Sequence, residues 1–337
     1  MERVIREVWA DHFGREVGPH DDFYDLGGDS ITVTDIVLLA RERGLDVRSS
    51  AALRYSTPAR LAEHLTIGAD GPPKDVPGLR SSAEDVCAQE WNPADVEPAP
   101  IVEEGENVPL FVVHSYSHVQ AEREAVAGWV RRRPAFGLAL PGGNGPVPPM
   151  SSLREIGERY AAAIGARLSH GRIRLAGFGP GAAVAVEVAR VLARSAEVEQ
   201  LVLVNPPALD RRPEPLDVVH SRHLDVFARR FGLDGTESAT QAHERVDQEH
   251  GWYRGCTPPD LARLQLASAL FDRLLSEYGP EPYEGPAVLF QDSAVPERTW
   301  RPILPRLDVH KLGYGLTSPH AIIGDPALAD MIRRTPA

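Results

Sequence analysis

Residues 22–31 read Asp-Phe-Tyr-Asp-Leu-Gly-Gly-Asp-Ser-Ile, and this stretch decides the fold of the first part of the chain. Gly27 and Gly28 permit a tight turn, because glycine has no Cβ to restrict the backbone. Ser30 then stands at the start of a helix, where its hydroxyl is presented to solvent. A modifying enzyme can reach a serine in this position.

Helical patterns lie on both sides of this turn. Apolar residues at helical spacing predict one helix near residues 4–13 and a second that starts at Ser30. A further helix begins at Ser56-Thr57-Pro58, where the hydroxyls can cap and proline fits the first turn. We therefore predict a small all-α domain over residues 1–67.

The ten residues of the turn resemble the phosphopantetheine attachment motif of peptidyl carrier proteins, which implies a four-helix carrier fold for residues 1–67. Gly-Asp-Ser alone is also compatible with an ordinary helix start, but the full stretch in its helical context favours the carrier interpretation. The resemblance implies that a phosphopantetheinyl transferase moves 4'-phosphopantetheine from coenzyme A to Ser30. The thiol arm then holds an acyl or aminoacyl thioester, with Asp29 beside the attachment site near the positive end of the helix.

Residues 68–107 lack periodicity and gather proline, glycine, serine and acidic residues, as in Gly71-Pro72-Pro73. Such a composition predicts a semi-extended linker. Trp91 is a candidate for docking this linker locally.

Short apolar runs alternate with helical patterns over residues 108–337. Such runs are typical of strands buried on both faces of a parallel sheet. The expected strands are residues 110–113, 136–140, 173–175, 201–204 and 287–290. Between about residues 214 and 280 only helical patterns remain, which predicts a helical lid.

This order of segments resembles the carrier and thioesterase end of nonribosomal peptide synthetases, which implies an α/β-hydrolase fold for the second domain. Residues 174–182, Arg-Leu-Ala-Gly-Phe-Gly-Pro-Gly-Ala, resemble the strand and turn that carry the nucleophile in Gly-x-Ser-x-Gly. Gly179 occupies the serine position, so an acyl-enzyme route through this position is closed. Pro180 follows it and has no N–H for an oxyanion hole.

Other catalytic positions of the thioesterase pattern are also changed. Asn205 stands where these enzymes carry the acid after the next strand, and an amide cannot stabilise an imidazolium by charge. Residues 114–118, His-Ser-Tyr-Ser-His, replace a small glycine-containing loop. We expect natural loss or redirection of activity rather than one isolated substitution.

His320 and Asp292 are the remaining catalytic candidates. His320 is either a retained general base or a remnant packed in the cleft, and Asp292 is either a working acid or a turn residue after a strand. A displaced nucleophile at Ser115, Tyr116 or Ser117 stays open. Further candidates are better explained structurally: Cys256 as an incidental thiol, and His220 and His223 as a solvated helix face.

Composition narrows the classes of partner. The 337-residue chain carries a formal charge of −12, which disfavours nucleic acid and anionic membranes. The one basic run, Arg131-Arg132-Arg133, reads as a solvated helix end. No apolar run spans a bilayer, and neither cysteine has metal-site spacing. We expect a cytoplasmic protein without a metal centre.

Together these features predict a phosphopantetheine carrier of nonribosomal peptide biosynthesis, loaded at Ser30. The second domain is expected to be a pseudo-thioesterase that binds the acyl group or recruits a tailoring enzyme. The alternative is direct acyl transfer or hydrolysis with His320 as base. Expected partners are the transferase and upstream synthetase domains or a tailoring enzyme.

Overall fold

The computed structural model describes most of the chain, in seventeen segments separated by short gaps. These are residues 1–28, 32–45, 47, 49–67, 76–82, 87–105, 107–114, 126–130, 133–142, 145–168, 171–209, 212–231, 233, 235–249, 256–291, 295–311 and 326–334.

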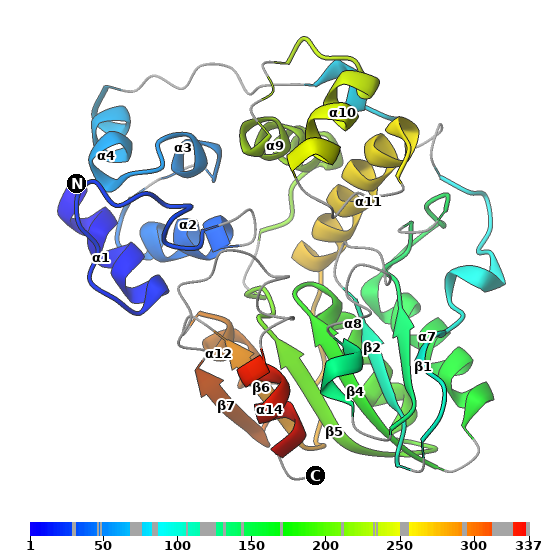
Figure 1. The fold of residues 1–337 in the computed structure, drawn as a ribbon. Helices are drawn as coiled ribbons and strands as arrows, with labels where there is room; N and C mark the ends of the chain where they lie inside the picture. Colours follow the sequence, from blue (N-terminus) through cyan, green and yellow to red (C-terminus); the bar gives the residue numbers. More distant parts are fainter. Residues whose placement is uncertain are drawn as a thin grey trace.

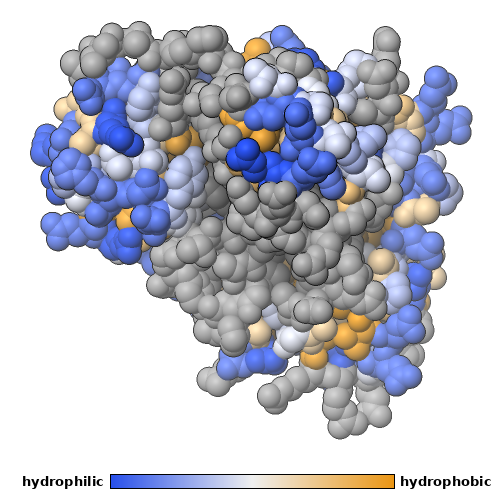
Figure 2. Space-filling model, turned by 45° about the horizontal axis from the view of Figure 1, so that its top comes forward, coloured by the Kyte–Doolittle hydropathy of each residue, from blue (hydrophilic) through white to orange (hydrophobic). Residues whose placement is uncertain are grey.

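The first part of the chain is the expected helical domain. It contains α1 (Glu2–Phe13), α2 (Thr32–Glu42), α3 (Ser49–Arg54) and α4 (Pro58–Ile67). Trp9 and Phe23 are fully buried at its centre, with their rings 5.4 Å apart edge to face. Its outer surface, at the left of Figure 2, is mostly hydrophilic. The amphipathic helices thus close a separate small core.

The second part contains a seven-stranded sheet in the order β1-β3-β2-β4-β5-β6-β7. Only β1 is antiparallel to its neighbour, so the expected α/β fold with a mostly parallel sheet is confirmed. The strands are β1 (Ala99–Val102), β2 (Leu110–Val113), β3 (Ala135–Leu138), β4 (Arg172–Phe178), β5 (Glu197–Val204), β6 (Ala287–Gln291) and β7 (Leu307–Lys311).

Helices cover both faces of the sheet (Figure 1). Alternate strand residues pack on one side with α7 (Leu153–Arg167) and α8 (Gly181–Leu192). The intervening residues pack on the other side with α14 (Pro326–Arg334) and the helical residues 126–129. Burial on both faces explains the continuous apolar runs in the sequence.

The segment expected as a lid contains α9 (Leu216–Arg230), α10 (Ala239–Glu249) and α11 (Pro258–Ser276), which we call the lid helices. A capping box at Thr257 and Asp260 starts α11. Part of the expected linker belongs to this unit, because Val76 and Leu79 are buried against the lid helices. The short helix η1 (Pro77–Leu79) holds them there.

The segment expected as a linker therefore differs from a free tether. It also contributes the short helix η2 (Pro93–Asp95) and the edge strand β1. Trp91 docks it, since the Arg159 guanidinium lies 4.5 Å above the Trp91 ring. The strand is four residues long, follows Pro98 and contains Pro100, so no local pattern distinguishes it from a loop.

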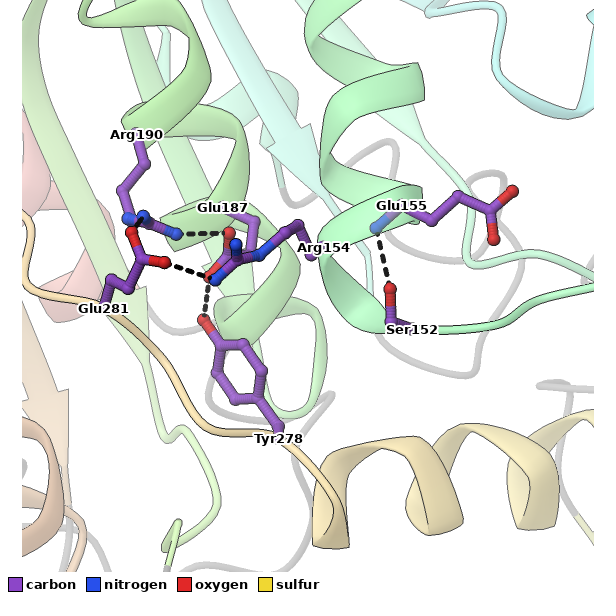
Figure 3. A network of polar contacts seen from close by, with 7 residues as sticks. All are labelled: Ser152, Arg154, Glu155, Glu187, Arg190, Tyr278 and Glu281. Atoms are coloured by element: carbon purple, nitrogen blue, oxygen red, sulfur yellow. Dashed lines mark hydrogen bonds and ion pairs between the residues drawn. The ribbon is translucent and has the colours of Figure 1, made fainter.

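A partly buried ion cluster fixes α8 to the elements around it (Figure 3). Glu187 is 1% exposed and accepts hydrogen bonds from Arg190 and from the Tyr278 hydroxyl, each at 2.7 Å. Glu281 links Arg190 to Arg154 of α7. Tyr278 follows the lid, so the cluster ties α7 and the end of the lid to α8.

Candidate functional site

The loop before Ser30 is held by the carboxylate of Asp22. Its Oδ1 accepts the Tyr24 N–H at 2.8 Å, and its Oδ2 accepts the Ser56 hydroxyl at 2.5 Å. Ser56 precedes α4, and the Tyr24 hydroxyl donates to the Leu53 carbonyl at 3.0 Å. The loop is thus fastened to both α3 and α4.

The two glycines of this loop have different structural roles. Gly27 has φ of 95°, a conformation that residues with a Cβ rarely adopt. A Cβ on Gly28 would lie 2.3 Å from the Phe23 ring. Asp29 and Ser30 lie outside the described residues. The loop that leads to them has the tight turn that the attachment motif requires.

Residues 177–181, which we call the elbow, join β4 to α8. A Cβ on Gly177 would lie 2.5 Å from Ala182 Cα, and one on Gly181 would lie 2.6 Å from the His114 carbonyl oxygen. Gly179 has φ of 48°. Its N–H donates to the Val204 carbonyl at 2.9 Å. The elbow therefore keeps the sharp strand-to-helix turn of a nucleophile position.

The elbow keeps the backbone shape of a nucleophile turn but lacks its catalytic groups. Gly179 presents no hydroxyl at the tip of the turn, and Pro180 has no N–H to stabilise an oxyanion. The N–H groups of Ala182 and Ala183 are bonded to the carbonyls of Gly179 and Pro180, at 3.1 and 3.2 Å. A covalent acyl-enzyme cannot form through the residue at this tip.

Asn205 lies beside the elbow at the carboxyl edge of the sheet. It follows β5, and Phe178 of β4 pairs in register with Val204 of β5. Asn205 has φ of 44°, which asparagine tolerates better than most residues, and its N–H donates to Phe290 at 2.7 Å. The structure thus brings Gly179 and Asn205 together. Asp292, His320 and Ser115 to His118 lie outside the described residues.

Other candidates can be placed individually. Cys256 is buried, and burial raises the pKa of its thiol, which disfavours the reactive thiolate. The expectation of a solvated face at His220 and His223 is wrong. His220 is 4% exposed, and His223 Nε2 lies 2.9 Å from Asp272 Oδ2 of α11. His223 thus links α9 to α11, while His220 is buried. The sequence around these histidines did not indicate this, because Asp272 lies on α11, far along the chain.

The helical domain packs against the edge of the sheet that carries Asn205. Ala208, three residues beyond Asn205, is fully buried in the core of the helical domain. Glu42 at the end of α2 forms an ion pair of 2.8 Å with Arg298 of α12 (Val295–Trp300). In Figure 1, α3 also lies beside α9 of the lid. The contacting surfaces are thus α2 and α3 on one domain and the 205–209 loop, α9 and α12 on the other.

The contacting loop is fixed to the sheet domain. The Trp300 indole N–H donates to the Pro207 carbonyl at 2.8 Å, and Trp300 is fully buried. The Leu209 N–H donates to the Thr299 hydroxyl oxygen at 3.2 Å. The loop after Asn205 is therefore a fixed support for the helical domain.

Comparison with known proteins identifies the first domain. Residues 3–65 match the family described as "Phosphopantetheine attachment site". The chain joins this phosphopantetheine carrier domain to an α/β domain with a mostly parallel seven-stranded sheet. The carrier's group is 4'-phosphopantetheine, bound covalently, and the glycine turn at Gly27 and Gly28 fits its attachment.

Relatives and solved structures cover the second domain as well. Atromentin synthetase invA1 from Paxillus involutus is 27% identical over 80% of this chain, which spans 28% of that protein. Nonribosomal peptide synthetase imqB from Aspergillus flavus is 24% identical over 86% of this chain and 8% of its own length. The chain thus spans less than a third of these relatives. The Vlm2 thioesterase domain has a similar fold, with TM-score 0.51 and 13% identity over 70% of this chain and 95% of that domain.

Two kinds of site have no support in the described part of the chain. No group of three or more histidine, cysteine or acidic side chains there is placed to hold a metal ion. No helix within the described segments is long and apolar enough to cross a membrane.

Proposed function

We propose that Ser30 carries the phosphopantetheine arm and that the second domain binds the attached acyl group without forming an acyl-enzyme. The observation that carries this proposal is the elbow, where the backbone turn of a nucleophile is kept and the nucleophile position is Gly179. A pseudo-thioesterase of this kind retains the shape of the acyl site and lacks the attacking atom.

Two neighbouring groups support the same proposal. Pro180 offers no N–H to a tetrahedral oxyanion, and Asn205 replaces a carboxylate with an amide. Each change weakens a different part of acyl transfer: the nucleophile, the oxyanion site and the stabilisation of the base. A change to glycine at position 179 alone would leave the oxyanion site and the stabilisation of the base in place.

The position of the carrier domain supports a role in holding its own cargo. The carrier packs against the loop that follows Asn205 and against the lid helix α9. An acyl group delivered from this side reaches the carboxyl edge of the sheet, where ligands of open α/β sheets bind. The second domain then shields the thioester or presents it to another enzyme.

The proposed partners follow from this role. A phosphopantetheinyl transferase loads the carrier, and upstream synthetase domains or a tailoring enzyme act on the bound acyl group during peptide biosynthesis. The printed names of the relatives, which are synthetases, support this setting. Because loading needs coenzyme A, we propose that the protein acts in the cytoplasm.

The test is a deacylation assay on the full chain. Ser30 is loaded with a model acyl group by a transferase, and intact mass follows its loss with and without an added amine. We expect loss no faster than that of the same acyl thioester of coenzyme A in the same buffer, and unchanged in His320→Ala. Faster loss that His320→Ala abolishes would refute the binding role and establish His320 as a general base.

A further inference from the structure

A second concave site lies on the α14 side of the sheet, at the end opposite the elbow. It is a cavity of about 400 Å³, within the size range of small-molecule sites. Its walls come from the strands β2, β4 and β5, from Trp129, Val130 and Arg133, and from α14. Neither the loop of residues 22–28, which we call the carrier loop, nor the elbow contributes to it.

The floor of the cavity is one row across the sheet. Leu110 of β2 pairs in register with Arg174 of β4, and Arg174 pairs with Gln200 of β5. The next row on this face is apolar, with Ala176 opposite Val202. Two polar side chains therefore occupy sheet positions that are apolar elsewhere on this face.

Three guanidinium groups line the cavity. Arg174 bonds to Glu199 at 3.2 Å and its side chain is 18% exposed. Arg333 of α14 pairs with Asp330, and Arg133 donates to the Val108 carbonyl at 2.7 Å. Burial and then repulsion from Arg174 lower the pKa of Arg133. The three cations face two carboxylates, so the site has an excess of positive charge.

Gln200 supplies a donor that the protein leaves unused. It is 2% exposed, and its Oε1 accepts from Arg174 Nη1 at 3.3 Å. Because a guanidinium only donates, the Gln200 oxygen must face Arg174 and the Nε2 amide must face away. Nε2 has no hydrogen-bond partner among the described residues. A buried donor without a partner is costly, and a ligand acceptor in the cavity would satisfy it.

We propose that this cavity binds a small organic carboxylate with an apolar body. The carboxylate accepts from Gln200 Nε2 and from the free N–H groups of Arg174 and Arg133, which are suited to planar anions. The apolar body packs on Trp129, Val130 and Ile332, which line the remaining walls. The site is separate from the proposed acyl site and does not depend on phosphopantetheine.

The test uses two probes of the same shape and different charge. Hexanoate and hexanamide are titrated into the full chain by calorimetry. The change in tryptophan fluorescence that Trp129→Phe removes is a second readout. We expect hexanoate to bind at least about tenfold more tightly than hexanamide. Equal binding of the two, or no binding of hexanoate, would overturn the proposal. Inorganic phosphate that binds as tightly as hexanoate would also overturn it, because the apolar walls would then have no role.

Matched variants locate the binding. Gln200→Glu keeps the shape and the bond to Arg174 but removes the donor and adds a negative charge, so we expect at least about a tenfold loss of hexanoate affinity. Arg172→Gln is the control, since Arg172 lies on β4 with Arg174, bonds to Glu199 and does not line the cavity. It should change affinity by less than about twofold. Unchanged affinity in a folded Gln200→Glu variant would place the binding elsewhere and refute this site. A Ser30→Ala background should leave all of these affinities unchanged, which separates this test from that of the carrier.

Discussion

The carrier loop and the elbow are two glycine turns that each precede a helix, and they have opposite chemical outcomes. Gly27 and Gly28 lead to a serine in the first, and Gly177 and Gly181 enclose a glycine in the second. Both backbones are held by contacts that exclude a Cβ. The two turns show that packing can preserve the shape of a turn after the side chain at its tip has lost its function.

The largest effect is expected when the serine that follows the carrier loop is removed. Ser30→Ala should abolish attachment of phosphopantetheine entirely, because Ser30 is the only serine in the attachment motif of residues 22–31. Intact mass after treatment with a transferase and coenzyme A measures it, with Ser195→Ala in the second domain as the control. A remaining mass increase in Ser30→Ala would show another attachment site.

The glycines that enclose the two turns should be equally intolerant of a methyl group. Gly28→Ala places a Cβ against Phe23, and Gly181→Ala places one against the His114 carbonyl. We expect each to lower the free energy of unfolding by about 1–3 kcal/mol. Gly145→Ala is the control, since a Cβ there meets nothing within 4 Å. Chemical denaturation measures all three, and a control as costly as the others would contradict this account.

Acid should act first on the carrier domain. His12 of α1 is 1% exposed, neither ring nitrogen has a hydrogen-bond partner among the described residues, and burial lowers its pKa to about 3. The unfolded chain takes up this proton near pH 6.5, so stability is complete above that pH and falls until about pH 3. The loss is about 1.4 kcal/mol per pH unit, or about 2 kcal/mol at pH 5.

His12→Gln is the matched variant, because it keeps a polar side chain that does not titrate. Its unfolding free energy should be flat where that of the parent falls, when both are measured between pH 7 and 4. Parallel pH profiles for the two proteins would show that other groups cause the acid sensitivity.

Restoring the side chain at the elbow should be insufficient for catalysis. Gly179→Ser places a Cβ at φ of 48°, which costs about 1–2 kcal/mol of stability. Pro180 and Asn205 remain, so we expect little acceleration of deacylation. Gly179→Ala carries the same strain without the hydroxyl and is the control for intact-mass assays. Fast release by Gly179→Ser alone would show that the rest of the site is intact.

The smallest effect is expected at the contact between the domains. Glu42 and Arg298 are each about half exposed, at 46% and 51%, so their ion pair contributes at most about 1 kcal/mol. Glu42→Arg should weaken the contact slightly, and the double reversal with Arg298→Glu should restore it. The yield of a cross-link between cysteines placed on α3 and α9 measures this. If the double reversal gives no more cross-link than Glu42→Arg alone, Glu42 and Arg298 do not form a direct ion pair.

Some site features were predictable because they depend on local rules. The Gly27-Gly28 turn and the glycine elbow are short motifs whose backbone needs are set by neighbouring residues. Asn205 could be placed beside Gly179 because adjacent parallel strands end at the same edge. The roles of Asp292, His320 and Ser30 stay predictions.

Periodicity and turn chemistry are local, so the helical carrier, the buried parallel strands and the missing nucleophile could be predicted from the sequence. The pairing of residues 99–102 with the sheet and the burial of Ala208 in the carrier core became visible in the folded chain alone. The fold also placed Arg174 beside Gln200 over a cavity. Strand pairing and the burial of charge depend on residues far apart in the chain. A local sequence pattern therefore does not show which distant segment will pack against it.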